Sequence, residues 1–331
     1  MHRAVSIPVA GQSGNEAGVD DVAGDNCGEV ALRSPQAERY PELARAWDEF
    51  ADNIARAGGT DLSAMIQYGQ VAWSSTGLAE RQRQTLSSWL DGTQWRCSSK
   101  VDTIVDLGSG DGEMIAALLE AQRFKGRVKA VVLVDRNEDA LERARRCLDR
   151  RHEKKIAVMV RRMDLRDPAI WNGVQPERTL AFASASLHEL PRTDKATTLA
   201  RAAAHVSQML LVELASDHDS PRTGSTILTE HALWFYDALI GDAYASVQSL
   251  SDRQAIIGAF LLQEFSKLTS QPYERRVNYH LDARGWQTVL TKAGFAIQDA
   301  LEAELLPGGP KTLFIAGSGA VRRMATPDPG L

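Results

Sequence analysis

Cysteine is scarce in this chain, and the few cysteines lack the spacing of metal or redox motifs. Cys27, Cys97 and Cys147 are the three cysteines among 331 residues, and no two of them form a C-x-x-C pair. Structural zinc sites and dithiol redox motifs place two cysteines a few residues apart. The sequence therefore favours neither kind of site, and it predicts a reducing, cytoplasmic environment.

Long apolar runs are also missing. No segment approaches the roughly 20 apolar residues that cross a bilayer, and the opening MHRAVSIPVAGQSGNEAG has no apolar signal-peptide core. We therefore expect no membrane partner. Residues 1–35, rich in Gly, Asp, Ser and Asn, are predicted to form a flexible leader, and residues 321–331 a similar tail.

The chain has no excess of positive charge. Its net charge is −5 and its pI is about 5.9, so it has no general field that would attract phosphates, and we expect no nucleic-acid partner. Basic residues do gather between positions 143 and 162. A solvated helix face is the favoured interpretation of that stretch, and an anion-binding patch is the alternative.

A glycine-rich turn is the most informative motif that is present. Residues 104–112 read IVDLGSGDG, an apolar strand that leads into glycines at alternate positions. A buried strand followed by a sharp turn and an amphipathic helix, here residues 113–122, is typical of a nucleotide-type cofactor pocket. A plain tight turn is the alternative. The glycines are Gly108, Gly110 and Gly112.

The glycine spacing separates two classes of cofactor. A dinucleotide site needs GxGxxG, but Glu113 stands at the position of its third glycine. The observed GxGxG follows an acidic residue, Asp106, and leaves room for a methionine-type amino acid beside an adenosine. An NAD-dependent oxidoreductase is therefore disfavoured.

Two further acidic residues follow predicted strands. Residues 128–135 form an apolar run that ends in Asp135, whose carboxylate is placed to accept both ribose hydroxyls. Asn137 is a natural N-cap for the helix that follows. A third strand, IAVMVRRMD, is predicted to end at Asp164, which is placed to meet an adenine amino group.

From residue 103 to residue 317 the chain resembles the class I S-adenosylmethionine-dependent methyltransferases. The resemblance implies S-adenosylmethionine as cofactor and S-adenosylhomocysteine as product. It implies that Asp106 and the glycines of the turn line the methionine portion, that Asp135 binds ribose and that Asp164 contacts adenine. The predicted cofactor-binding residues are Asp106, Gly108, Ser109, Gly110, Gly112, Asp135, Arg136, Met163, Asp164, Leu165 and Ser184.

The same resemblance implies an α/β fold, a Rossmann-like, mostly parallel seven-stranded sheet with an antiparallel last strand. Strand four is predicted over residues 179–187 and strand five over 210–214, with a helix over 194–208 between them. Gly294 ends the last helix, GWQTVLTKAGF, as a left-handed cap. A closing hairpin then follows around Pro307 to Pro310.

Two segments outside this core predict a helical cap. Residues 36–98 form an N-terminal helical cap before the core at 99–215, and residues 216–281 form a helical lid inserted before the end of the core at 282–320. A lid over the methyl donor would exclude water and align the acceptor.

His188 is the best candidate for a catalytic base, because it follows strand four in SASLHELP. Packing or positioning is the alternative role. Glu189 follows it directly, and His231 and Tyr236 are weaker catalytic candidates from the lid. Tyr279 and His280 could also reach the donor, although structural roles are commoner for such residues.

No metal site is predicted. Asp217, His218 and Asp219 carry suitable ligand atoms, but their spacing matches no established ligand pattern, and a solvated loop is favoured.

The predicted activity is methyl transfer to an O, N or activated C atom of a small organic acceptor, in natural-product biosynthesis. Methyltransferases that act on nucleic-acid adenine or protein glutamine carry an Asn-Pro-Pro-Tyr type signature where this chain reads SASLHEL. The alternatives are an RNA or protein methyltransferase and a non-catalytic cofactor-binding module. The sequence is compatible with a homodimer.

Overall fold

The computed structural model describes residues 34–57, 62–152 and 155–319, which form two compact units. Among the described residues, the core unit consists of residues 80–219, 278–305 and 310–319. The cap unit consists of the described residues up to Ala79 together with residues 220–277 and 306–309. Cys27, most of the predicted leader and the predicted tail lie outside the described residues.

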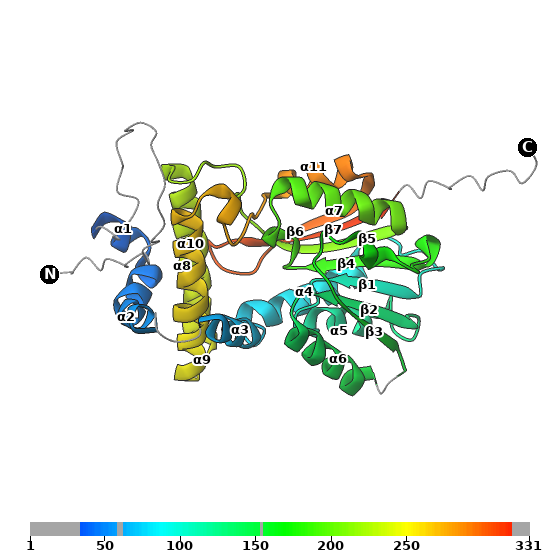
Figure 1. The fold of residues 1–331 in the computed structure, drawn as a ribbon, viewed down its shortest axis with the longest axis horizontal. Helices are drawn as coiled ribbons and strands as arrows, with labels where there is room; N and C mark the ends of the chain where they lie inside the picture. The colour runs from blue at the N-terminus through cyan, green and yellow to red at the C-terminus, as the bar shows by residue number, and fades with distance from the viewer. Residues whose placement is uncertain (1–33, 58–61, 153–154, 320–331) are drawn as a thin grey trace, which may run out of the picture. The chain divides into compact units, whose positions relative to one another are not determined.

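A seven-stranded sheet forms the centre of the core unit, with the strand order β3-β2-β1-β4-β5-β7-β6 (Figure 1). The first five of these strands are parallel, and β7 is antiparallel to both β5 and β6. The predicted sheet and closing hairpin are therefore confirmed. The strands are β1 Thr103–Leu107, β2 Ala130–Asp135, β3 Ala157–Arg162, β4 Thr179–Ser184, β5 Gln208–Ala215, β6 Phe295–Glu304 and β7 Lys311–Gly319.

Helices cover both faces of the sheet (Figure 1). The alternation of side chains along a strand explains this arrangement, since Ile104 belongs to one buried apolar cluster while Val105 and Leu107 belong to the other. The first cluster includes side chains of α4 (Gly77–Gly92), α5 (Glu113–Glu120) and α6 (Glu138–His152), and the second those of α7 (Arg192–His205) and α11 (Ala283–Ala293).

Several predicted ends of elements are corrected by the structure. Strand four ends at Ser184 and not at residue 187, because Ala185 has a left-handed φ of 47° and Leu187–Glu189 form a 3-10 turn, η3. The helix predicted over residues 194–208 ends at His205, since Gln208 already begins β5. The left-handed cap at Gly294 is confirmed, with φ 105°.

The third strand is also shorter than predicted. β3 ends at Arg162, two residues before Asp164, because Asp164 begins the tight turn that its backbone carbonyl closes with Asp167 N. The short 3-10 helices elsewhere are η1 Pro168–Trp171, η2 Pro176–Arg178 and η5 Tyr273–Arg275.

The cap unit is helical. Its longest helix, α8 (Thr226–Ser246), buries Leu233, Phe235 and Tyr236, and the Tyr236 ring lies edge-on to Phe265 with a centroid distance of 5.9 Å. A π-helical stretch, η4, joins α9 to α10. The other helical segments of this unit are α1 Ser34–Arg39, α2 Pro41–Ala57, α3 Leu62–Trp73, α9 Leu250–Gln254, η4 Ala255–Leu261 and α10 Leu262–Ser270.

The compact units divide the chain at different positions from the predicted segments. Residues 80–98 belong to the core unit, because Leu86, Trp89 and Leu90 of α4 pack in the apolar cluster on one face of the sheet. Within the described ranges, no helix has the length and apolar character needed to cross a bilayer.

Candidate functional site

The glycine-rich turn lies at the carboxyl end of β1, the edge where parallel sheets bind ligands. Gly108 N and Ser109 N both donate to Val134 O of β2, at 2.8 and 3.0 Å. Gly108 has φ 72°, and a Cβ atom placed there would lie 2.3 Å from Ser186 Cβ. Only glycine therefore fits between the turn and the segment that follows β4.

The other two glycines have different surroundings. Gly110 has φ 51°, and no atom lies within 4 Å of the position where its Cβ would stand. Gly112, the N-cap of α5, packs so closely on α6 that a Cβ would lie 2.7 Å from Ala144 Cα. The turn is thus anchored at both ends and has open space at its middle glycine, as a cradle for a bound group requires.

Three carboxylates surround this turn. Asp106 is buried at the end of β1, and burial raises the pKa of its carboxyl well above the usual range, an effect that Asp135 and Asp111 reinforce. Carboxylates that raise the pKa of a neighbour create a negative potential. The turn is therefore suited to a group that carries positive charge and is unsuited to a pyrophosphate.

Asp135 ends β2 and connects it to the glycine-rich turn. Its Oδ2 accepts a hydrogen bond from Gly110 N at 3.1 Å, and its Oδ1 accepts one from Asn137 N at 2.9 Å. Because each carboxylate oxygen has two lone pairs, both oxygens keep capacity for a hydroxyl donor. The predicted N-cap Asn137 is observed, with Oδ1 accepting from Asp139 N at 3.0 Å.

Asp164 lies beyond β3 and forms an ion pair with Arg166. Nε and Nη2 of Arg166 donate to its two carboxylate oxygens, each at 2.7 Å, and Arg166 N donates to Oδ1 at 2.9 Å. These hydrogen bonds lower the pKa of Asp164 to about 2. The neighbouring side chains of Met163 and Leu165 are partly buried against the apolar cluster on the α7 face.

The ion pair between Asp164 and Arg166 predicts how the unfolding free energy of the protein changes with pH. The pKa of Asp164 is lowered in the folded protein, so its stabilising effect is complete above the unfolded pKa of about 3.9 and disappears as the pH falls to about 2. We expect Arg166→Met to flatten the decline in unfolding free energy over this window, as measured by denaturant titration at several pH values. Both side chains are more than a third exposed, so the change is small.

Arg145→Met is the matched control, because Arg145 is also an exposed arginine and its Nε lies 3.9 Å from Asp149 Oδ2, at the limit of an ion pair. An equal effect of both substitutions would show that the ion pair of Asp164 is not responsible.

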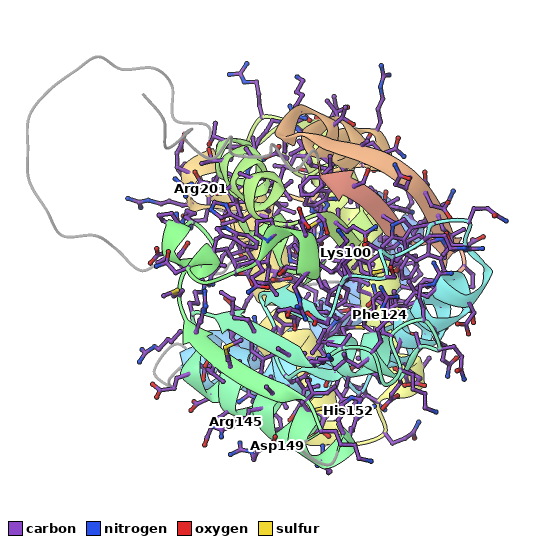
Figure 2. All side chains as sticks on the ribbon, turned by 90° about the vertical axis from the view of Figure 1, so that its right-hand side faces the viewer. Lys100, Phe124, Arg145, Asp149, His152 and Arg201 are labelled. Atoms are coloured by element: carbon purple, nitrogen blue, oxygen red, sulfur yellow. The ribbon has the colours of Figure 1, made fainter. Side chains whose placement is uncertain are left out.

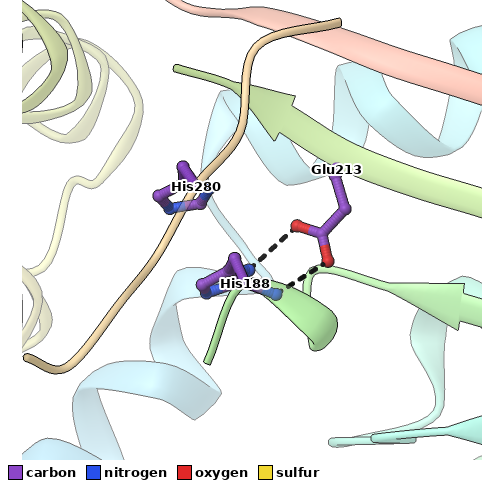
Figure 3. Close-up of side chains that lie close together, drawn as sticks. All are labelled: His188, Glu213 and His280. Carbon is purple, nitrogen blue, oxygen red and sulfur yellow. Dashed lines mark hydrogen bonds and ion pairs between the residues drawn. The ribbon is translucent and has the colours of Figure 1, made fainter. Parts of the chain in front are cut away.

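His188 pairs with a buried glutamate of the neighbouring strand (Figure 3). Its Nδ1 donates to Oε2 of Glu213 at 2.9 Å, and Oε1 of the same carboxylate accepts from the backbone N–H groups of Ser186, Leu187 and His188, at 3.1, 2.9 and 3.3 Å. A carboxylate can only accept, so the Nδ1–H tautomer of His188 follows, and Nε2 carries the lone pair. This is the arrangement of a histidine that accepts a proton.

Glu213 was not among the residues predicted from the sequence. It lies in β5, in the apolar run LLVEL, and its side chain is fully buried. A lone acid within such a run was the available signal, since buried carboxylates are retained only where they are paired and hydrogen-bonded.

His280 packs against His188, and a third histidine, His218, packs against His280. The ring of His280 stacks on it with centroids 4.2 Å apart and planes 16° apart, and the ring of His218 lies edge-on to His280 at 5.3 Å. His218 Nδ1 is 2.9 Å from Asn278 Oδ1, and its Nε2 is 3.0 Å from Ser216 Oγ. His218 is thus buried and hydrogen-bonded, which corrects the prediction of a solvated loop at this position.

The remaining predicted site residues are distributed over both units. Ser184 is the last residue of β4. Glu189 forms an exposed ion pair with Arg136 at 3.1 Å, between the turns after β4 and β2. His231 and Tyr236 belong to α8 of the cap unit, where Tyr236 is a fully buried core residue with its hydroxyl 3.4 Å from Glu264 Oε2.

Several arginines of the basic stretch on α6 and β3 form ion pairs with acidic side chains. Arg146 pairs with Glu142, Arg151 with Glu120 at 3.2 Å, and Arg145 lies beside Asp149 (Figure 2). Because these charges are paired, the stretch has the character of a solvated helix face.

Comparison with solved structures finds proteins of similar fold. No protein-family model and no curated protein matches the chain. Among solved structures, SCL7 from Oryza sativa is 13% identical with a TM-score of 0.61, and the match covers 89% of this chain and 96% of that one. The methyltransferase SibL is 18% identical with a TM-score of 0.48, covering 87% and 71%. Magnesium protoporphyrin IX methyltransferase from Synechocystis PCC 6803 is 11% identical with a TM-score of 0.41, covering 73% and 83%.

The likeness at these identities concerns the fold alone. The chain has the sheet order and the antiparallel closing strand of the class I S-adenosylmethionine-dependent methyltransferase fold. A fold does not establish an activity, which has to be argued from the site.

Proposed function

We propose that this protein transfers the methyl group of S-adenosylmethionine to a small organic acceptor. The observation that carries the proposal is that Ser186, two residues before His188, closes on the glycine-rich turn. Its Oγ donates to Leu107 O at 2.6 Å. The cofactor cradle and the histidine–glutamate pair are therefore parts of one site.

The residues of the cradle fit this cofactor. The carboxylates of Asp135 and Asp111 beside the turn favour the ammonium and sulfonium charges of S-adenosylmethionine, and Asp135 has lone pairs for ribose hydroxyls. Asp164 is the candidate for the adenine contact, although its carboxylate already pairs with Arg166. When bound, the cofactor supplies an electrophilic methyl group.

The contribution of the protein is alignment and removal of a proton. Nε2 of His188 accepts the proton of a hydroxyl or ammonium acceptor, and Glu213 stabilises the resulting imidazolium through the hydrogen bond to Nδ1. A carbon acceptor with an acidic proton could use the same base. Natural-product biosynthesis is the proposed setting, in the cytoplasm.

The decisive experiment follows labelled methyl from S-adenosylmethionine into a fractionated cell extract. Label in small molecules supports the proposal. Label in RNA or protein would instead identify a macromolecular methyltransferase, and cofactor binding without any labelled product would identify a non-catalytic module.

Asp135→Asn should weaken the binding of S-adenosylmethionine by at least tenfold. The substitution removes the charge of a ribose-binding carboxylate, and hydrogen bonds to a charged group contribute about 1.5–3 kcal/mol each. Isothermal titration calorimetry measures the change. Asp139→Asn is the control, because Asp139 is an exposed acid of the following helix; equal affinities of the two variants would contradict the assignment of Asp135.

A further inference from the structure

Residues 220–277 of the cap unit form an insertion in the core unit, the cap insertion. The segment 278–281, which follows it, holds His188 by two separate contacts. Tyr279 N donates to the backbone carbonyl of His188 at 2.6 Å, and the next residue, His280, stacks on the His188 ring. One contact fixes the backbone and the other the plane of the imidazole.

The segment is itself held firmly. The carbonyl of His280 accepts from the backbone N–H groups of His218 and Asp219, at 3.0 and 3.2 Å, and Asn278 contacts the ring of His218. On the other side, the buried ammonium of Lys195 in α7 donates to Tyr279 O. His280 is therefore supported from two neighbouring elements of the fold.

The His280 ring remains neutral in this setting. Burial lowers its pKa well below the usual value, and His188, His218 and Lys195 lower it further, while a hydrogen bond with the backbone of Leu214 acts in the opposite direction. The Glu213 carboxylate is hydrogen-bonded to His188. A proton that enters the pair is therefore disfavoured on His280.

The stacking of the His188 and His280 rings also argues against a metal site at these residues. His188, Glu213 and His280 each offer a ligand atom, and the three atoms lie within 4.8 Å of one another (Figure 3). However, ring nitrogens in nearly parallel stacked planes direct their in-plane lone pairs side by side, whereas two histidine ligands of one metal must direct them to a common point. The geometry favours a pair that handles a proton.

We propose that His280 is a positioning residue of the methyl-transfer site, which fixes the His188 ring so that Nδ1 stays on Glu213 and Nε2 meets the acceptor. This inference rests on the proposed function for its kinetic effect. The expected effect of His280 on the tautomer of His188 does not depend on turnover.

The test compares His280→Ala, which removes the stacked ring, with His280→Phe, which restores a flat ring. We expect His280→Ala to lower kcat at least tenfold, with the KM for S-adenosylmethionine changed less than twofold. His280→Phe should recover kcat to within about threefold of the wild type, because stacking needs the ring plane and not the ring nitrogens.

The second readout is the tautomer of His188, measured by ¹⁵N NMR of the full-length protein. We expect the Nδ1–H form in the wild type and in His280→Phe, and a mixture of tautomers in His280→Ala. His205→Ala is the matched control, since the His205 ring also stacks within this unit, on Trp171 at 5.9 Å. It should change neither kcat nor the tautomer.

Three results would overturn the inference. They are an unchanged His188 tautomer in His280→Ala, a His280→Phe protein as inactive as His280→Ala, and stoichiometric Zn²⁺ binding that is lost in His280→Ala. If no variant or wild-type protein transfers methyl groups but the tautomer responds as expected, the positioning by His280 stands and the proposed function fails.

Discussion

Gly108→Ala should destabilise the core unit by about 2–5 kcal/mol and abolish binding of S-adenosylmethionine. A left-handed backbone costs a residue with a side chain about 1–2 kcal/mol, and forcing an extra methyl into a packed position adds about 1–3 kcal/mol. Both costs apply here, because the new Cβ would lie 2.3 Å from Ser186 Cβ at a φ of 72°. Denaturant unfolding and calorimetric titration measure the two effects.

Gly126→Ala separates the cost of the left-handed backbone from the cost of the close contact with Ser186. Gly126 has nearly the same φ, 71°, but no atom lies within 4 Å of the place that a Cβ would take there. We therefore expect only the backbone cost of about 1–2 kcal/mol and unchanged cofactor affinity. Equal destabilisation by the two substitutions would show that the contact between Gly108 and Ser186 does not constrain the turn.

Glu213→Ala should destabilise the protein by at least the cost of one unsatisfied buried donor, about 1–3 kcal/mol, and reduce methyl transfer at least a hundredfold. The substitution leaves three backbone N–H groups and the His188 ring without their common acceptor in a fully buried place. Unsatisfied buried donors cost about 1–3 kcal/mol each, although the turn can relax to recover part of this.

Glu213→Gln tests the chemistry with less damage to the fold, because its amide oxygen can still accept the backbone hydrogen bonds. We expect most of the stability to return while methyl transfer remains low, since the charge that stabilises protonated His188 is absent. Glu302→Ala is the control, a strand glutamate with an exposed side chain. Wild-type turnover in Glu213→Gln would contradict the role of the pair.

The strands and the glycine-rich turn could be predicted because their signals are local. Apolar runs such as residues 130–134 end in acids or glycines, and glycine at three alternate positions permits few backbone conformations. The predicted left-handed cap at Gly294 is confirmed for the same reason.

The partners of His188 could not be predicted because they come from distant parts of the chain. Glu213 lies 25 residues further on and looks like one polar residue in an apolar strand. His280 is reached only after the cap insertion, and no periodicity relates it to His188. The left-handed conformation of Ala185 depends on the contacts of its neighbours and has no signature in the residue type.

The pairing of β5 with β7 has a consequence for synthesis of the protein on the ribosome. Gln208 pairs with Ser318, a separation of 318 − 208 = 110 residues, and the cap insertion is translated between them. Contacts this distant in sequence form slowly. During elongation β5 therefore remains at an open sheet edge, with Glu213 in place before His280 has been made. The proton-handling site would be among the last parts of the nascent chain to assemble, and premature termination within the insertion would leave an exposed strand edge prone to aggregation.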